Sequence, residues 1–345
     1  MTLKLGAYTA CLHDRPLAAA LDVLGSNGLT SVEVNTGGFI PSPHCHVDLL
    51  LSSAQARRDY LGVFASRGME LTGLNCNGNP LNPLPGVGPK HADDLRRTIE
   101  LAGLLGVPNV VTMSGTPGSD PGARYPSWVV NPWDGVYLDV LDYQWGVAAE
   151  FWAGIDAQAR ASGVRVAIEM HPHNLVFSPV TLRRLVDLTG ATSIGAEMDP
   201  SHLMWQGMDV VASIRWLGPL VFHAAAKDAM ITPGVAIRGV LDTSLRAGPG
   251  RCRGQGAHRL RVLVRRLAAG PGVAVRGGRR RPRRPVLDRV PPRPGRGRPG
   301  HGGQHRARGR RLLPPRRPGS RRRQPPRRRG QDVTERGVPV RTVPD

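Results

Sequence analysis

The sequence predicts an α/β fold, a (β/α)8 barrel of parallel strands that is incomplete and holds about seven strands. Short apolar runs rich in β-branched residues alternate with longer helical patterns over residues 1–245. These strand candidates recur roughly every 25 to 50 residues, and no G-x-G-x-x-G follows the first one, which favours a barrel over a dinucleotide-binding sheet. After residue 245 the composition changes, so no eighth strand is expected.

The elements follow in order along the chain. Strands are predicted near Lys4–Ala10, Ser31–Asn35, Glu70–Cys76, Asn109–Ser114, Val164–Met170, Ser193–Asp199 and Leu220–Ala226. Helices are predicted over Pro16–Ser26, Ser52–Arg67, Pro89–Leu105, Tyr143–Ala161 and Pro179–Leu188. Several of these helices begin with Pro in the first turn and end at Gly, and these residues are common at the two ends of helices.

The formal net charge of +21 is divided unevenly along the chain. Residues 246–345 hold 31 of the 47 basic residues, all of them Arg, and 4 of the 26 acidic ones, so residues 1–245 are net acidic. All 16 Phe, Trp and Tyr residues also lie in the first part. We therefore expect a barrel domain at 1–245 and a disordered tail, rich in Arg, Gly and Pro, at 246–345.

Four cysteines lie far apart without a C-x-x-C pair, which argues against a disulfide scaffold or a zinc ribbon. No apolar run approaches the roughly 18 residues that span a bilayer, and the N-terminus lacks a signal-peptide pattern. A cytoplasmic protein without membrane contact is expected.

Polar side chains follow several predicted strands at the edge where barrel enzymes place their chemistry. Glu169 and His171 occupy alternate positions, so a strand points both to the same side. A carboxylate and an imidazole can then reach one centre. The alternative is a hydrogen-bonded pair at a hydrated strand end.

The next strands add further candidates. Asp199 and His202 stand in an Asp-Pro-Ser-His turn that can bring the imidazole back to the carboxylate, a pair suited to a divalent metal or its substrate. The alternative is an Asp that caps the turn. His223 lies in the seventh predicted strand, and the alternative to a ligand role is a buried core histidine. Lys227 follows at the end of that strand, and Asn77 follows the third predicted strand.

At these residues the chain resembles the sugar phosphate isomerase/epimerase family, the xylose isomerase-like TIM barrels, from Leu5 to about Ser244. The Asp-Pro-Ser-His-Leu-Met-Trp-Gln run is the most specific match. The others are Leu-Gly-Ala-Tyr-Thr-Ala-Cys-Leu at 5–12, Asn-Cys-Asn-Gly-Asn-Pro-Leu at 75–81, Ile-Glu-Met-His-Pro at 168–172 and Ala-Lys-Asp at 226–228.

The resemblance implies a divalent metal, Mn, Mg, Zn or Co, held by Glu169, Asp199 and His223. Many relatives have His-x-His-Ala-Lys-Asp, and Ala225 stands at the second His position here. The implied chemistry is proton transfer through an enediolate, with Glu169 as one of two carboxylates and the other on the eighth strand. His202, His171, Lys227 and Asn77 would bind the substrate, a sugar or sugar phosphate. The family also implies a homo-oligomer.

The tail's composition is typical of GC-rich DNA translated out of frame. In the neighbouring frame the codons of 281–287 permit Gly-His-Asp-x-x-Phe-Trp, and those of 304–309 permit Asn-Ile-Glu-His-Glu-Asp, which resembles the family's eighth strand. We therefore expect a frameshift near Ser244 and an isomerase that is inactive or impaired as the chain is written. The alternatives are non-specific, salt-sensitive nucleic-acid binding by the tail, or an endonuclease-like, dehydratase or non-catalytic barrel.

Overall fold

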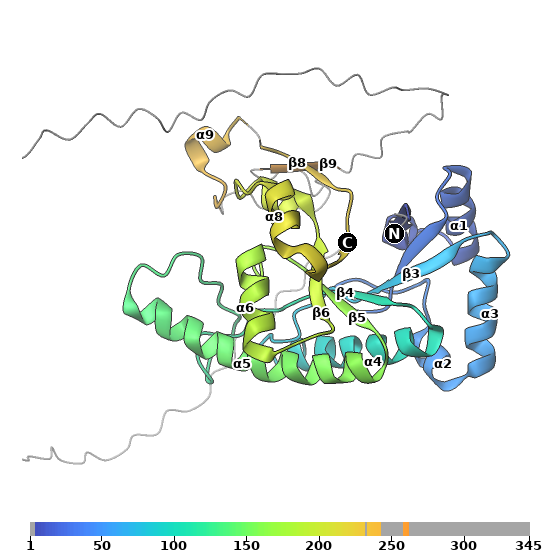
Figure 1. The fold of residues 1–345 in the computed structure, drawn as a ribbon, viewed down its shortest axis with the longest axis horizontal. Coiled ribbons are helices and arrows are strands. Elements are labelled where there is room, and N and C mark those ends of the chain that lie inside the picture. Colours follow the sequence, from blue (N-terminus) through green and yellow to red (C-terminus); the bar gives the residue numbers. More distant parts are fainter. Residues whose placement is uncertain (1–3, 232, 243–257, 262–345) are drawn as a thin grey trace, which may run out of the picture. The chain divides into compact units, whose positions relative to one another are not determined.

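The computed structural model describes residues 4–231, 233–242 and 258–261, the last without side chains. Seven parallel strands form one sheet in chain order, β1 to β7, which curls as an incomplete barrel (Figure 1). These strands are β1 Gly6–Tyr8, β2 Ser31–Asn35, β3 Glu70–Asn75, β4 Asn109–Met113, β5 Arg165–Glu169, β6 Ile194–Met198 and β7 Val221–Ala224. The prediction of a seven-stranded, incomplete barrel is confirmed.

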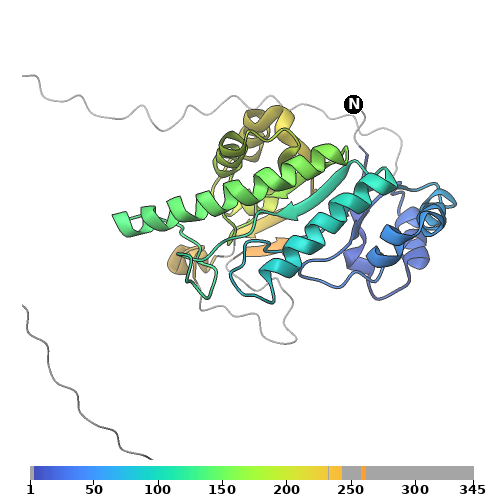
Figure 2. The same cartoon turned by 90° about the horizontal axis from the view of Figure 1, so that it is seen from below.

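Helices connect the successive parallel strands, as crossover connections require. They are α1 Leu17–Ser26, α2 Val47–Ser52, α3 Ala54–Ala65, α4 Gly88–Leu105, α5 Gly135–Ala161, α6 Pro179–Thr189, α7 Pro200–Met204, α8 Val210–Leu217 and α9 Val235–Arg238. Short 3-10 helices lie at η1 Thr9–Leu12 and η2 Gly218–Leu220. Figure 2 shows α4 and α5 side by side on the outer face of the sheet.

The parallel sheet ends at β7 within the described ranges. Beyond it, β8 Asp228–Ile231 pairs antiparallel with β9 His258–Arg261 in a separate two-stranded sheet. The predicted change at residue 245 and the tail to residue 345 lie outside the described residues, apart from the backbone of β9. The domain boundary therefore stays a prediction.

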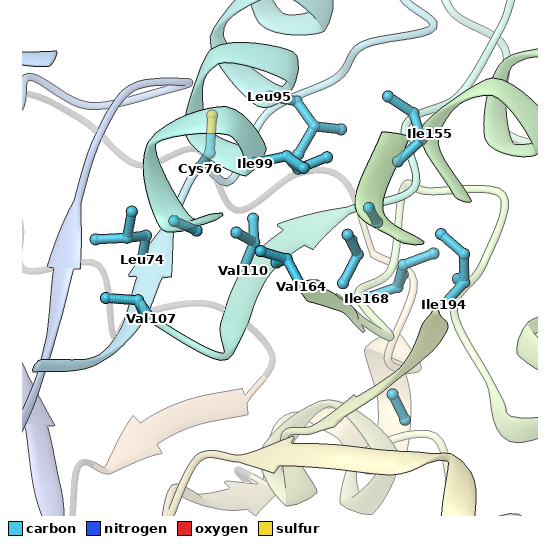
Figure 3. Close-up of a cluster of buried hydrophobic side chains, with 14 of the residues drawn as sticks. Leu74, Cys76, Leu95, Ile99, Val107, Val110, Ile155, Val164, Ile168 and Ile194 are labelled. Carbon is cyan, nitrogen blue, oxygen red and sulfur yellow. The ribbon is translucent and has the colours of Figure 1, made fainter. Parts of the chain in front are cut away.

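The hydrophobic core lies between the sheet and its helices (Figure 3). Val110 and Ile168 from the strands and Ile99 and Ile155 from α4 and α5 have no exposed surface. Trp152 of α5 is also fully buried, and its indole donates to the carbonyl of Ser114 at 3.2 Å. This layer fixes where β4 and β5 end, and therefore where the polar residues that follow them lie.

Two helix boundaries differ from the sequence prediction. The helix expected over residues 52–67 is α3, which begins at Ala54 because Ser53 is extended and its side chain caps α3 by accepting from the backbone of Ala56. A further short helix, α2, precedes it. The helix expected from Tyr143 begins at Gly135, where Asp134 caps it. Val136 and Leu138 in its first turns are exposed, so no core-facing apolar stripe marked that start.

No helix among the described residues is both long enough and apolar enough to span a bilayer.

Candidate active site

The candidate site lies where β5, β6 and β7 end side by side. Parallel strands in register bring equivalent positions together, and Glu169 pairs in register with Glu197, which pairs with His223. The next residues along the chain, His171 after β5 and Asp199 after β6, stand just beyond the strand ends. Residues that are far apart in the sequence thus lie side by side at the ends of three neighbouring strands.

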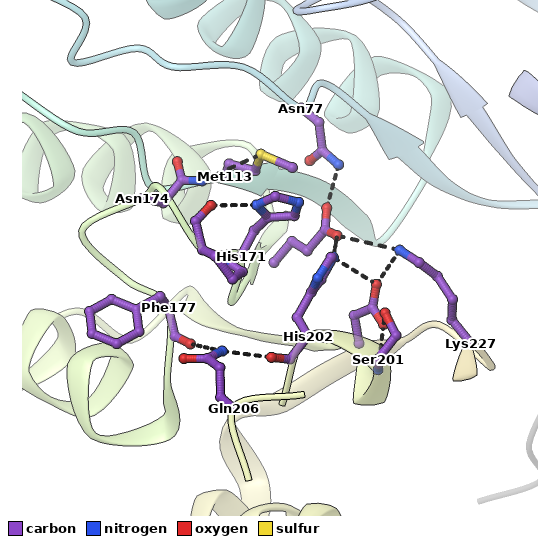
Figure 4. Close-up of polar contacts among 12 residues, drawn as sticks. Asn77, Met113, His171, Asn174, Phe177, Ser201, His202, Gln206 and Lys227 are labelled. Atoms are coloured by element: carbon purple, nitrogen blue, oxygen red, sulfur yellow. Dashed lines mark hydrogen bonds and ion pairs between the residues drawn. The ribbon is translucent and has the colours of Figure 1, made fainter. Parts of the chain in front are cut away.

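Glu169 contacts Asn77, His202 and Lys227, three residues that Figure 4 labels. Its Oε1 lies 3.0 Å from His202 Nε2 and 3.9 Å from Lys227 Nζ. Its Oε2 accepts from the Asn77 amide at 2.6 Å. The side chain is only 7% exposed, so three protein groups, not water, surround most of this carboxylate.

Asp199 caps the turn and also contacts His202. Its Oδ1 accepts from the backbone and hydroxyl of Ser201 at 2.9 and 2.6 Å, which caps α7. Its Oδ2 lies 3.2 Å from His202 Nε2 and accepts from the Lys227 ammonium. The turn therefore does fold the histidine back, and Lys227 bridges the two carboxylates.

Opposing charges keep this cluster ionised although it is buried. Burial alone would raise the pKa of Glu169, but His202, His171 and Lys227 outweigh it and hold that pKa below its usual value. Burial also opposes ionisation of Asp199, yet His202 and Lys227 lower the pKa of that carboxyl strongly. In turn, the two carboxylates raise the pKa of His202 despite its burial.

His171 stands beside His202, with ring centroids 4.1 Å apart. Its Nδ1 donates to the carbonyl of Pro172 at 2.6 Å, which leaves a lone pair on Nε2 of the neutral ring. Burial and the neighbouring His202 lower the pKa of His171, which favours that neutral form.

Among the described residues, Glu169, His171 and His202 form a group that could hold a metal ion. One ligand atom from each lies within 4.8 Å of the other two. A carboxylate oxygen with two imidazole nitrogens suits divalent transition metals. The residues present therefore fit such an ion, although the set differs from Glu169, Asp199 and His223, which the family resemblance implies.

His223 faces a partner that the sequence did not reveal. Its Nε2 lies 2.7 Å from Oε2 of Glu33, which comes from β2 on the far side of the open sheet. Glu33 Oε1 accepts from the Asn75 amide at 2.7 Å. The only sequence signal for Glu33 was a carboxylate inside the apolar run Ser-Val-Glu-Val-Asn.

Glu197 is a second carboxyl group that sequence analysis missed. It is 6% exposed, lies next to Glu169 in register, and its Oε2 has no hydrogen-bond partner among the described residues. Burial, together with the charges of Glu169, Glu33 and Asp199, raises its pKa well above the usual value. An uncharged carboxylic acid is therefore expected beside the Glu169 carboxylate.

Comparisons with known proteins place this geometry in a family. The chain is 38% identical over 246 residues to the uncharacterized protein YfiH of Bacillus subtilis strain 168. This alignment covers 70% of the present chain and 78% of that relative.

Two solved structures are similar to this chain, and the first of them shares its fold. One is the probable 3-DHS dehydratase AsbF of Bacillus anthracis, with a TM-score of 0.51, 15% identity and coverage of 74% of this chain and 82% of that one. The other is the 3-keto-D-glucoside 4-epimerase YcjR of E. coli, with a TM-score of 0.48, 11% identity and coverage of 65% and 78%.

A family model described as the xylose isomerase-like TIM barrel matches residues 21–273, which is well over half of the chain. The matched range extends past the composition change at residue 245. The sheet of seven parallel strands, the polar cluster at its C-terminal edge and this match agree. The chain belongs to the xylose isomerase-like TIM barrel family.

Proposed function

We propose that this protein is a sugar isomerase or epimerase that moves a proton next to a carbonyl group with the help of a divalent metal. The observation that carries the proposal is the contact set of Glu169: a buried carboxylate, kept ionised, in one group of candidate metal ligands with two histidines. Membership of the xylose isomerase-like family supports this assignment.

The metal would be held by Glu169 together with His171 and His202. Asp199 would join them if the Lys227 ammonium gave up its contact with Oδ2, because a single cation can occupy that position. His223, the ligand that the family resemblance implies, would have to leave Glu33. A bound divalent ion would polarise the substrate carbonyl and stabilise the charge of the enediolate. Mn, Mg, Zn and Co all remain candidates for its identity.

Glu169 is the group that takes and returns the proton. An ionised carboxylate can accept the proton from the carbon next to the carbonyl, and exclusion of water strengthens every charge interaction in the site. The Asn77 amide holds Oε2 at 2.6 Å and so sets the direction of its lone pairs. The Lys227 ammonium offers donors that can bind substrate oxygens once the sugar enters.

We expect this activity to be limited. The family resemblance places the second carboxylate on an eighth strand, and the parallel sheet of the described residues ends at β7. Glu169 alone can remove a proton and return it to the same face of the carbon. We therefore expect proton exchange with solvent to outpace net conversion of the sugar.

Deuterium exchange tests the proposal without knowledge of the product. The purified chain with Mn²⁺ in deuterium oxide is expected to place deuterium next to the carbonyl of at least one sugar in a panel of aldoses and ketoses, read by mass spectrometry. Glu169→Gln keeps the shape of the side chain and is expected to abolish exchange.

The matched control is Glu70→Gln, because Glu70 starts β3 on the surface and is 54% exposed. It is expected to exchange at the wild-type rate. Exchange that survives Glu169→Gln, or none with any sugar in the panel, would contradict the proposal.

A further inference from the structure

A chain of hydrogen bonds connects β2 with the end of β5. Glu33 of β2 and Asn75 of β3 are 8% and 3% exposed, and Nδ2 of Asn75 donates to Oε1 of Glu33 at 2.7 Å. Oδ1 of Asn75 accepts from the backbone N–H of Asn77 at 3.0 Å. Asn77 in turn donates to Oε2 of Glu169 at 2.6 Å. Three successive hydrogen bonds therefore connect two carboxylates on different strands.

The Asn75 amide has one orientation that satisfies both of its neighbours. A carboxylate accepts hydrogen bonds, whereas a backbone N–H only donates. Nδ2 of Asn75 faces the Glu33 carboxylate and Oδ1 faces the Asn77 N–H, so each group meets its complement. A flipped amide would set acceptor against acceptor and donor against donor, which is costly for buried groups. Glu33 therefore determines which way this amide points.

The loop after β2 holds the backbone around Asn77. Thr36 donates to the backbone carbonyl of Asn75 from both its N–H and its hydroxyl, at 2.8 and 2.9 Å. The N–H of Phe39 donates to the carbonyl of Asn77 at 2.8 Å. Gly38, whose φ is +81°, lies so close that a Cβ would collide with the same carbonyl. These contacts fix the backbone from which the Asn77 side chain extends to Glu169.

Glu33 makes a separate contact with each oxygen. Oε1 holds Asn75, and Oε2 lies 2.7 Å from Nε2 of His223. Departure of His223 toward a metal would leave the contact with Asn75 in place. The hydrogen bond that orients Asn75 is thus independent of the one that His223 makes.

From this chain of contacts, we infer that Glu33 and Asn75 are positioning residues for Glu169. Glu33 orients the Asn75 amide, and Asn75 fixes Asn77. Asn77 then directs the lone pairs of the carboxylate that transfers the proton. Displacement of such a carboxylate lowers the rate of the chemical step far more than it weakens substrate binding. The inference rests on the proposed function and adds residues of β2 and β3 to the site at the ends of β5, β6 and β7.

An exchange of donor and acceptor tests the inference. Asn75→Asp sets a second carboxylate against Glu33 and so removes the hydrogen bond between the two residues. Glu33→Gln/Asn75→Asp restores that bond in the opposite direction, because the glutamine amide donates to the aspartate and its oxygen still faces His223. In the deuterium-exchange assay, Asn75→Asp should lower the rate constant at saturating sugar at least about tenfold, with KM within about twofold of wild type. The double variant should recover most of the wild-type rate.

Nuclear magnetic resonance reads the position of Asn77 without metal or sugar. Isotope labelling of asparagine alone gives side-chain signals from nine residues, few enough to resolve, and Asn77→Leu identifies the signal of Asn77 by its loss. This signal should move in Asn75→Asp and return toward its wild-type position in the double variant. A role limited to stability would lower the urea midpoint and leave the signal in place.

The outcomes separate the inference from the proposed function. If wild type exchanges deuterium and Asn75→Asp exchanges equally fast, or the double variant stays as slow as Asn75→Asp, the inference fails and the proposed function stands. If wild type exchanges no deuterium with any sugar, the proposed function fails and the inference fails with it. Asn75→Ala removes the same contact by truncation, should show the same two effects, and replaces Asn75→Asp if that variant does not fold. Asn27→Asp, on an exposed residue after α1, controls for the substitution itself and should keep the wild-type rate.

Discussion

Replacement of Lys227 by Met is expected to expose how much the site depends on one cation. The ammonium contacts Asp199, which is 1% exposed, and approaches Glu169, which is 7% exposed, so its removal leaves two buried carboxylates with His202 alone. Loss of one partner from a buried ion pair costs about 3–5 kcal/mol. Because Lys227 is itself 27% exposed and His202 stays, we expect about 2–3 kcal/mol.

Urea unfolding in the presence of EDTA measures this loss. With a slope of about 2 kcal/mol per M, the unfolding midpoint should fall by roughly 1 M. Mn²⁺ should then stabilise Lys227→Met more than wild type, because the ion no longer competes with the ammonium for Asp199.

Lys4→Met is the matched control, since Lys4 pairs with Glu70 on the surface and the two side chains are 56% and 54% exposed. Exposed pairs contribute about 0–1 kcal/mol, so its midpoint should barely move. Equal midpoints for Lys227→Met and wild type would refute the ion pair. Equal stabilisation of both by Mn²⁺ would refute the competition between Lys227 and the metal.

Three further predictions concern the core, a helix cap and the gene. Trp152→Ala should lower the free energy of unfolding by about 3–5 kcal/mol, since it removes a fully buried indole; a loss under 1 kcal/mol in urea would contradict the packing. Ser178→Ala should cost about 1 kcal/mol and Ser178→Gly less, because Ser178 forms a capping box with Thr181; equal costs would argue against the cap. Sequencing of the genomic DNA across codons 242–249 should reveal an indel, and an intact open frame together with the full tail in the protein's measured mass would refute the frameshift.

The relations between site residues at the ends of β5 and β6 could be predicted because they depend on local sequence patterns. Alternation along β5 predicted that Glu169 and His171 share a side, and the structure places a ligand atom of each within 4.8 Å of the other. The Asp-Pro-Ser-His turn predicted the return of His202 to Asp199, and the structure shows that contact. These relations involve residues within three positions of one another, where backbone geometry decides the outcome.

The interior partners could not be predicted because they depend on the curvature of the sheet. Glu33 and His223 lie 190 positions apart on strands that are not neighbours, and their contact follows from how seven strands curl. Likewise, the burial of Glu197 between Glu169 and His223 follows from strand register, which a single sequence does not specify.

Metal stoichiometry tests the central claim most directly. Equilibrium dialysis against Co²⁺ followed by elemental mass spectrometry would count ions on wild type, Glu169→Gln and His171→Phe, with His46→Phe, a loop residue outside the cluster, as the control. We predict one tightly bound ion per chain in wild type and in His46→Phe, and its loss in the other two variants. Wild-type protein without a bound ion, or variants that keep it, would contradict a metal site at Glu169.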